Sequence, residues 1–236
     1  MEWGGSDYGN LLMQYCFTTR YEGVSQAPFD SLNLAFHVGD DRSNVRENRA
    51  RLEEKLGVSK LVFMDQVHGD TVVLVHTGDE SPTCDAMITN VKGIGLAVMV
   101  ADCIPILFYD EVHHAIGVAH AGRAGSLLNV GQKTAQAMAE TFGSRMEELK
   151  IWIGPSIHVC CYEVGIEVTE GFEKALQVKE GKYFLDLQRY NQEAFLALGV
   201  KREHIEISDV CSCCNADYFS YRREKQTGRF AGVITL

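Results

Sequence analysis

Residues 95–122 read GLAVMVADCIPILFYDEVHHAIGVAHAG, which is three apolar runs separated by short polar segments. The runs at Gly95–Val100, Ile104–Tyr109 and Ala115–Ala119 have the length of β-strands and contain almost no polar residues, a pattern typical of strands buried in a core. The polar segment Asp110–His114 joins the last two runs and predicts a hairpin. This stretch therefore predicts the buried centre of a β-sheet.

The rest of the chain mixes helices and strands without strict alternation. Apolar residues at helical spacing predict helices over residues 44–56, 125–142, 166–178 and 187–198. Ser43 is the expected N-cap of the first helix, and Gly57 is expected to end it. Further strands are expected over residues 61–67, 71–76, 149–153, 204–207 and 230–236. This order predicts an α+β domain with mixed sheets rather than a doubly wound parallel sheet.

The composition is that of an ordinary globular protein. The 236 residues are 46% hydrophobic and 23% charged, and they include only four prolines. No repeat or linker-like stretch interrupts them, so we expect one domain over residues 1–236. The net charge of −10, with basic residues scattered along the chain, argues against a nucleic-acid partner. A site for a small anion would need positive charge gathered locally.

The cellular compartment is predicted from two features of the sequence. The N-terminal residues lack the basic start and the apolar stretch of a signal peptide, and the longest apolar run is too short to span a bilayer. The eight cysteines are then expected to be reduced thiols, some of them metal ligands. We therefore expect a cytoplasmic protein without a membrane partner, whereas the sequence does not indicate an oligomeric state.

Three polar side chains stand where apolar strands end. They are His68, Cys103 and His120. Strand ends often carry binding groups, and Cys103 and His120 would be close if they lie on neighbouring strands of the hairpin. Two imidazoles and one thiolate form a zinc site with a fourth position open for water or substrate. The alternative is a core cysteine with two hydrogen-bonded histidines.

A series of short segments resembles the YfiH/laccase-domain family. They read SLNLAFHVGDD (31–41), DQVHG (65–69), CDAMITN (84–90), ADCIP (101–105), AHAG (119–122), IGPSI (153–157), YEVG (162–165), FSYRR (219–223) and TGR (227–229). These segments follow the order that they have in the family, and they cover most of the chain from about residue 31 to the C-terminus.

The resemblance implies a fold, a metal and an activity. The fold is α+β, with mixed β-sheets flanked by helices, of the CNF/YfiH-like cysteine-hydrolase type. The metal is Zn²⁺ on His68, Cys103 and His120. Family members are described as enzymes that cleave adenosine, inosine, guanosine and methylthioadenosine with phosphate and also deaminate adenosine. The implied small-molecule partners are therefore purine nucleosides and phosphate. Older descriptions name copper-dependent polyphenol oxidases, which makes Cu²⁺ the other metal to consider, and some bacterial members are implicated in editing peptidoglycan precursors.

Catalytic roles are expected for the three metal ligands and for Asp85. Asp85 and Asp102 are the carboxylates nearest to the matching motifs, and either could orient a ligand histidine or relay a proton. An aspartate at the end of a strand that caps a turn is the alternative for both residues.

Substrate contacts are expected from Asn33, His37, Arg49 and Arg123. Asn33 and His37 lie in a polar loop, where an Asx turn is the alternative for Asn33. Arg49 could reach an anion from the first helix or lie on its solvated face, and the same two alternatives hold for Arg222 and Arg223. The family usually reads His-Ala-Gly-Trp-Arg-Gly, but this chain has HAGRAG at residues 120–125. Arg123 therefore stands where the family has tryptophan and could supply a local positive charge.

The remaining cysteines leave a second metal site open. Cys211 and Cys214 have the C-x₂-C spacing of a zinc knuckle, and Cys160 and Cys161 could supply two more ligands. A second C-x₂-C pair is absent and adjacent cysteines rarely bind one tetrahedral ion together, so ordinary reduced thiols are the favoured interpretation.

Three other functions compete with the nucleoside enzyme. Cys103 and His120 could be the nucleophile and base of a thiol hydrolase, such as an amidase acting on a peptidoglycan precursor. A copper-dependent polyphenol oxidase is the second alternative, although the chain has eight histidines and no His-x-His pair. A non-catalytic binding protein is the third, because the tryptophan and arginine of the family are replaced.

Overall fold

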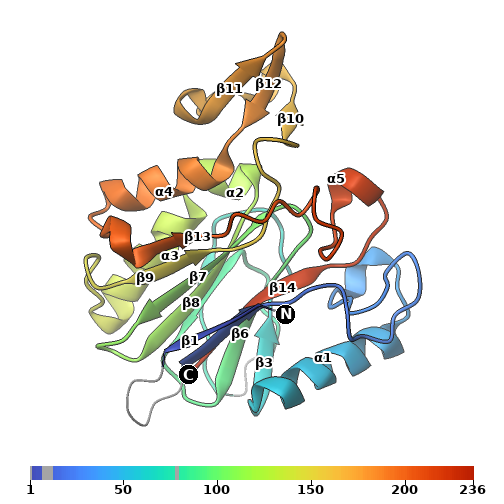
Figure 1. Cartoon of the computed structure of the whole chain (residues 1–236). Helices are drawn as coiled ribbons and strands as arrows, with labels where there is room; N and C mark the ends of the chain where they lie inside the picture. The colour runs from blue at the N-terminus through green and yellow to red at the C-terminus, as the bar shows by residue number, and fades with distance from the viewer. Residues whose placement is uncertain (1, 7–12, 78–79) are drawn as a thin grey trace.

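The computed structural model describes residues 2–6, 13–77 and 80–236, and two β-sheets packed face to face form its centre (Figure 1). The five-stranded sheet has the order β1-β2-β14-β6-β3, with strands Glu2–Ser6, Met13–Phe17, Phe230–Thr235, Ile94–Val100 and Lys60–Phe63. The six-stranded sheet has the order β13-β9-β7-β8-β5-β4, with strands Ile205–Ile207, Lys150–Ile153, Ile104–Asp110, Ala115–Ala121, Ala86–Thr89 and Val72–Leu74.

Helices cover the outer faces of both sheets, and a small third sheet projects from the body (Figure 1). The helices are α1 (Arg42–Leu56), α2 (Arg123–Leu127), α3 (Val130–Phe142), α4 (Leu187–Ala197) and the short α5 (Tyr221–Glu224). The small sheet has the order β10-β12-β11, with strands Glu163–Val164, Lys182–Leu185 and Leu176–Lys179. Single 3₁₀ turns are η1 (Phe36–Val38), η2 (Ile166–Val168), η3 (Glu173–Ala175) and η4 (Arg202–His204).

The central strands are apolar throughout because both of their faces are buried. Along β6, Leu96 and Val98 enter the layer between the two sheets, whereas Ala97 and Met99 pack toward α1. Side chains alternate in the same way along β8, where Val118 faces the inter-sheet layer and Ala119 faces the helices on the other side. The prediction of mixed sheets is confirmed, because parallel pairs such as β3 with β6 lie in the same sheets as antiparallel pairs such as β7 with β8.

The chain changes sheets between β6 and β7, at Ala101–Cys103. Asp102 has a left-handed backbone with φ 93°, which is uncommon outside glycine. Its carboxylate accepts hydrogen bonds from the Ser212 hydroxyl at 2.8 Å and from the backbone N–H of Arg222 at 2.6 Å. These bonds hold the crossing in place and put Cys103 at the edge of the layer between the sheets.

Several predicted boundaries need correction. Helix α1 begins at Arg42, and its N-cap is Asp41 rather than Ser43, because the Asp41 carboxylate accepts a 2.7 Å bond from the backbone N–H of Ser43. Gly57 ends the helix with φ 65°, as expected. The helix predicted over 125–142 is divided into α2 and α3 by Asn129, whose backbone is left-handed.

The helix predicted over residues 166–178 is wrong. This segment forms 3₁₀ turns and then strand β11, which pairs with β12 in the small sheet. Gly171 separates the turns with φ 83° and interrupts any helix. Phe172 and Ala175 are buried in the core, whereas Ile166 and Val178 are exposed, so the apolar spacing does not mark one buried helix face.

Two strands predicted around His68 are shorter than expected and lie in different sheets. β3 ends at Phe63, and β4 covers Val72–Leu74, so the bend at His68 connects the two sheets. The strands predicted near residues 95–119, 149–153, 204–207 and 230–236, and the helix near 187–198, are confirmed within a few residues.

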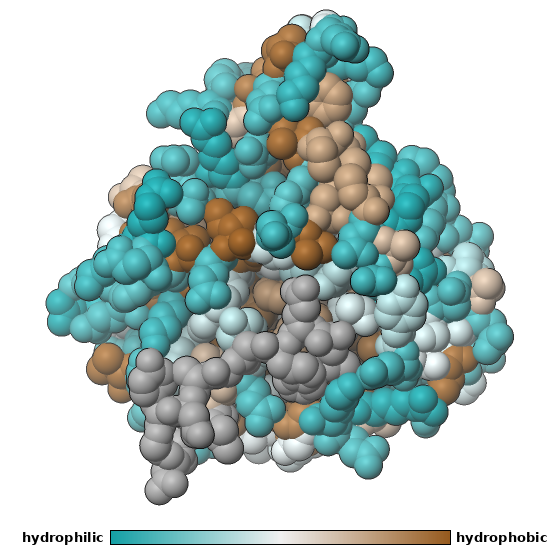
Figure 2. Space-filling view, viewed as in Figure 1, coloured by the Kyte–Doolittle hydropathy of each residue, from teal (hydrophilic) through white to brown (hydrophobic). Residues whose placement is uncertain are grey.

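The surface is mainly hydrophilic on the face shown in Figure 2, and hydrophobic residues gather where the small sheet meets the body. Among the residues that the structure describes, no helix has both the length and the apolar character needed to cross a bilayer.

Candidate active site

The hairpin and the inter-sheet bend bring Cys103, His120 and His68 together. In the hairpin Pro105 lies opposite His120 and Ile104 opposite Ala121, so Cys103 comes next to the histidine strand just before pairing starts. The sulfur of Cys103 and a ring nitrogen of each histidine all lie within 4.8 Å of one another. The two imidazole rings are nearly perpendicular, with centroids 4.8 Å apart.

Gly122 allows this close approach. A methyl group at residue 122 would lie 2.8 Å from the Cys103 sulfur and 3.6 Å from the His68 ring. The first of these contacts is well inside van der Waals distance, so any side chain here would displace the thiolate. The glycine that follows His120-Ala121 is therefore required by packing against the ligands.

Asp85 forms hydrogen bonds with two of the three candidate ligands, His68 and His120. It is fully buried at the start of β5, and one oxygen accepts from the His120 Nδ1 at 2.8 Å. The carboxylate also accepts from the backbone N–H groups of Val67, His68 and Gly69 at 3.2, 2.9 and 2.6 Å. This ring of donors stabilises the left-handed backbone of His68, whose φ is 60°. Asp85 thus fixes the His68 bend and directs the other nitrogen of His120 toward Cys103.

The sulfur and the histidine form a charged pair. Burial raises the pKa of Cys103, but the charge and N–H of His120, with a smaller contribution from His68, lower it to about 6. Burial lowers the pKa of His120, but the Cys103 thiolate and the hydrogen bond to Asp85 raise it to about 9. Near neutral pH the metal-free site therefore contains a thiolate and an imidazolium.

These donors fit a zinc ion. Zinc binds thiolate sulfur at about 2.3 Å and imidazole nitrogen at about 2.0–2.1 Å, and three protein ligands leave one tetrahedral position open. His68, Cys103 and His120 all line the same pocket, so an open position would face it. Asp85 on the far nitrogen of His120 is the carboxylate partner that metal-bound histidines usually have.

The pocket has a volume of about 380 Å³, which is within the range of about 300–1,000 Å³ common for small-molecule sites. Besides the three candidate ligands, it is lined by residues from the chain crossing, the N-terminal loop and the C-terminal third. They are His37, Gln66, Met99, Val100, Ala101, Asp102, Ile157, Tyr162, Tyr221, Arg222 and Arg229. Two arginines and two tyrosines thus give the cavity positive charge and aromatic surface.

The two arginines are held by backbone carbonyl groups. Nη1 of Arg222 donates to the carbonyls of Cys161 and Glu163 at 3.1 and 3.0 Å. Nη1 of Arg229 donates to Thr227 and Gly228 at 3.0 and 2.9 Å. Within the described residues the other guanidinium nitrogens of Arg229 have no hydrogen-bond partner, although burial lowers the pKa of this group. Arg229 therefore presents donors and charge to the cavity.

Of the four predicted substrate residues, His37 lines this pocket. Asn33 is fully buried. Its side-chain NH₂ donates to the Ala35 carbonyl and the Asp40 carboxylate, and its side-chain oxygen accepts from the backbone N–H groups of Ala35 and Arg229, which gives it a structural role.

Arg49 and Arg123 do not line the pocket. Arg49 is stacked between Phe36 and Phe63 and donates to the carbonyl of Leu34 at 2.9 Å. Arg123 is half-buried at the start of α2. Burial and the Cys103 thiolate raise the pKa of Tyr162, and the positive charge of Arg123 partly offsets this rise.

Arg222, for which contact with an anion was one of two alternatives, does line the pocket. Other pocket residues were not predicted. Tyr162, Tyr221 and Arg229 come from segments far from the candidate ligands in sequence, and each belongs to a segment that resembles the family. The YEVG, FSYRR and TGR segments were therefore the available signal. Asp102, proposed with Asp85 as a carboxylate near the site, does line the pocket, whereas Asp85 lies beneath the ligands.

Replacing Asp85 by asparagine should weaken zinc binding. The Asp85→Asn variant keeps the shape of the side chain but removes the negative charge beside His120, and it places an amide NH₂ against backbone N–H donors. We expect zinc affinity to fall by about 10–100-fold, measured by competition with a chelator. Asp70→Asn is the matched control, because Asp70 lies one residue beyond Gly69 and pairs with Lys133 at the surface. Equal affinity of wild type and Asp85→Asn would contradict this role.

Zinc binding should release protons in a pH-dependent way. Zinc must replace the proton of His120, so we expect about one proton from this residue between pH about 6 and 9. Above about pH 9 the release declines because His120 is already neutral, and below about pH 6 it increases because Cys103 must also ionise. Affinity therefore falls as pH falls. Calorimetry in buffers of different ionisation enthalpy measures the release, and a pH-independent value between pH about 7 and 10 would refute the ion pair.

Several known proteins are similar to this chain. The sequence profile of the family described as multi-copper polyphenol oxidoreductase laccase matches residues 14–236. Purine nucleoside phosphorylase YfiH of Escherichia coli is 38% identical, over 94% of this chain and 93% of that protein. Purine nucleoside phosphorylase YlmD of Bacillus subtilis is 32% identical, over all of this chain and 92% of that protein.

Solved structures show the same fold. The crystal structure of the hypothetical protein YfiH of Bacillus licheniformis superposes with a TM-score of 0.91 and 32% identity, covering 95% of this chain and 92% of that chain. YlmD of Geobacillus stearothermophilus gives a TM-score of 0.90 at 32% identity, covering 94% and 91%. The chain therefore belongs to the YfiH family of laccase-domain proteins.

Proposed function

We propose that this protein is a zinc-dependent purine nucleoside phosphorylase, which converts a purine nucleoside and phosphate to the free base and ribose 1-phosphate. The observation that carries the proposal is the candidate zinc ligand set, His68, Cys103 and His120, at the wall of a pocket that also contains Arg222 and Arg229. The names of the relatives from Escherichia coli and Bacillus subtilis support it.

Phosphate is the substrate that the arginines favour. The whole chain carries a net charge of −10, so an anion must be attracted by charge gathered within the cavity. Arg222 and Arg229 supply this charge, and their planar guanidinium groups suit the oxygens of phosphate. Fixed backbone carbonyls hold both groups, so little side-chain entropy is lost when phosphate binds.

The purine is expected to contact the aromatic and apolar part of the pocket. Tyr162 and Tyr221 offer ring faces, and Met99 and Ile157 offer apolar surface. Stacking of a base on an aromatic side chain contributes about 1–3 kcal/mol. The charge of Arg222 lies over the Tyr162 ring, 5.4 Å from its centroid, and connects the two parts of the pocket. The base and the phosphate can thus occupy neighbouring walls.

The reaction needs phosphate oxygen at the anomeric carbon while the purine leaves. The arginines hold and orient the phosphate, and the tyrosines fix the base so that the glycosidic bond faces the nucleophile. When bound by the two histidines and the cysteine, zinc supplies a Lewis acid that stabilises negative charge on an oxygen. Asp85 keeps His120 oriented for that ligand role.

Adenosine deamination is proposed as a second activity of the same pocket. A deaminase needs an activated water and a group that carries protons to the leaving amine. Among the described lining residues the only carboxylate is that of Asp102, which already accepts from Ser212 and from the backbone of Arg222. His37, which also lines the cavity, is the alternative proton carrier.

A thiol hydrolase is the second candidate, because the pKa of Cys103 is lowered to about 6 beside His120. This candidate predicts activity on an amide substrate that persists after zinc removal and is abolished by alkylation of the thiol. A multi-copper oxidase fits the donors less well. Within residues 2–6, 13–77 and 80–236, the site built on His68, Cys103 and His120 is the only group of three or more candidate ligands that contains histidine.

The first experiment is release of base from adenosine and inosine by the zinc-loaded protein, with and without phosphate. We expect release that requires phosphate, yields ribose 1-phosphate and is lost in Cys103→Ala. Cys16→Ala is the control, since Cys16 is a buried thiol of β2 in the five-stranded sheet and lies outside the pocket. Inosine formed from adenosine without phosphate would show deamination alone. No turnover of either nucleoside would disprove the proposal and favour amide substrates.

Arg229→Gln should weaken the binding of phosphate more than the binding of the nucleoside. Loss of a hydrogen bond to a charged group costs about 1.5–3 kcal/mol, so we expect the KM for phosphate to rise about 10–100-fold with a much smaller change for inosine. Arg46→Gln, an exposed arginine on α1, is the control. Steady-state kinetics with each substrate varied in turn measures the difference. An equal rise in both KM values would mean that Arg229 only maintains the structure of the pocket.

A further inference from the structure

A second group of candidate ligands lies outside the pocket. The sulfurs of Cys160, Cys161, Cys211 and Cys214 all lie within 4.8 Å of one another, and we call these four residues the cysteine cluster. The sequence favoured ordinary reduced thiols here, because a second C-x₂-C pair is absent and adjacent cysteines rarely bind one tetrahedral ion together. The structure instead gathers both pairs at one point.

Two turns make the four sulfurs converge. The backbone N–H groups of Cys161 and Tyr162 both donate to the carbonyl of His158 at 2.9 Å, and this tight turn brings the adjacent sulfurs of Cys160 and Cys161 to 3.8 Å. The C-x₂-C segment turns in the same way, with the N–H of Cys214 donating to the carbonyl of Cys211 at 3.1 Å.

The spacing of the sulfurs matches a tetrahedral zinc site. Four sulfurs at the usual Zn–S distance of about 2.3 Å are about 3.8 Å apart. Here Cys160 and Cys161 are 3.8 Å apart, Cys160 and Cys214 are 3.7 Å apart, and Cys161 and Cys214 are 3.2 Å apart. A disulfide would need about 2.05 Å, and all eight cysteines of the chain are free thiols.

The surroundings of Cys211 favour a thiolate. The backbone N–H of His158 points at its sulfur from 3.4 Å. The four sulfurs thus surround one point, where a single cation can bind all of them.

We propose that the cysteine cluster binds a structural zinc ion through four thiolates and thereby ties the loop after β9 to the loop before α5. Four protein ligands leave no open position, so this zinc is structural, whereas the three-ligand site in the pocket is open. The two loops come from residues about fifty apart in sequence and already pair through the backbones of Ser156 and Cys211, so a shared ion would hold them at a second point.

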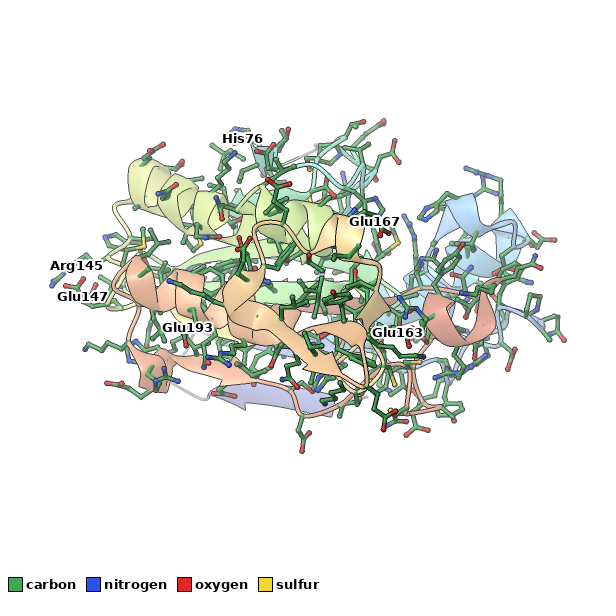
Figure 3. All side chains as sticks on the ribbon, turned by 90° about the horizontal axis from the view of Figure 1, so that it is seen from above. His76, Arg145, Glu147, Glu163, Glu167 and Glu193 are labelled. Atoms are coloured by element: carbon green, nitrogen blue, oxygen red, sulfur yellow. The ribbon has the colours of Figure 1, made fainter. Side chains whose placement is uncertain are left out.

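The cluster supports one wall of the pocket. Cys161 precedes Tyr162, which lines the cavity, and its carbonyl accepts from the Arg222 guanidinium. Glu163, labelled in Figure 3 on the side of the molecule near α5, accepts from the same guanidinium through its carbonyl. On the other loop, Ser212 lies between two of the cluster cysteines and donates to Asp102. A zinc ion here would fix Tyr162, Arg222 and Asp102 relative to one another.

Metal analysis of the full-length protein tests the proposal. For protein purified in reducing buffer with zinc, we expect two zinc ions per chain by mass spectrometry. Cys214→Ala should lower this to one, Cys103→Ala should also lower it to one, and the double variant should bind none. Cys213→Ser is the matched control, because Cys213 lies in the same loop outside the cluster, and it should keep two. These readouts do not depend on nucleoside turnover.

Two further measurements keep the test decisive if Cys214→Ala is unstable. Cys214→His can still supply a zinc ligand, so it should retain two zinc ions and a higher melting temperature than Cys214→Ala. X-ray absorption of Cys103→Ala should show the remaining zinc with four sulfur neighbours at about 2.3 Å. A wild-type zinc content that Cys214→Ala does not lower, nitrogen ligands in that spectrum, or a Cys161–Cys214 disulfide found by alkylation and mass spectrometry would each overturn the proposal.

Discussion

The buried carboxylate of Asp85 is the interaction on which the candidate zinc site depends. Asp85 immediately precedes β5, and its carboxylate contacts both the bend that contains His68 and the ring of His120 on β8. Burying a charge without partners is costly, and here four N–H donors compensate for it. Because the same carboxylate serves both histidines, their separation is set by one rigid group rather than by two independent loops.

The second constraint is the change of sheet between β6 and β7. β6 belongs to the five-stranded sheet, and the next strand, β7, belongs to the six-stranded sheet. The residues that connect them must therefore lie where the layer between the two sheets ends. Cys103 and Asp102 occupy this connection, and His120 reaches the same place because residues of its parity on β8 face the inter-sheet layer. Packing of the core thus delivers a thiol, an imidazole and a carboxylate to one edge.

The sequence predicted the parts of this arrangement that depend on local pattern. The apolar runs gave the hairpin, and the hairpin register then brings Cys103 next to His120. The pattern left Arg222 undecided between an anion contact and a solvated face, and it did not indicate Arg229, because the positions of both depend on how the C-terminal loops fold over the two sheets. The helix expected over residues 166–178 failed for a related reason, since Ile166 and Val178 are exposed and the end of the segment pairs with β12. Asn33 was expected in the site, but its buried amide is occupied by Ala35, Asp40 and the backbone N–H of Arg229, and Asn33 does not line the cavity.

The positive wall of the pocket is a local exception in an acidic protein. Neither guanidinium is neutralised within the described residues by a carboxylate ion pair; both are held instead by neutral carbonyl groups. Carbonyls orient a guanidinium and leave its net charge intact, whereas a salt bridge would cancel the field that an anion experiences. By contrast, Arg20, away from the cavity, pairs with Glu224 at 2.7 Å. The difference between these partners is what allows a chain of net charge −10 to offer an anion site beside a thiolate.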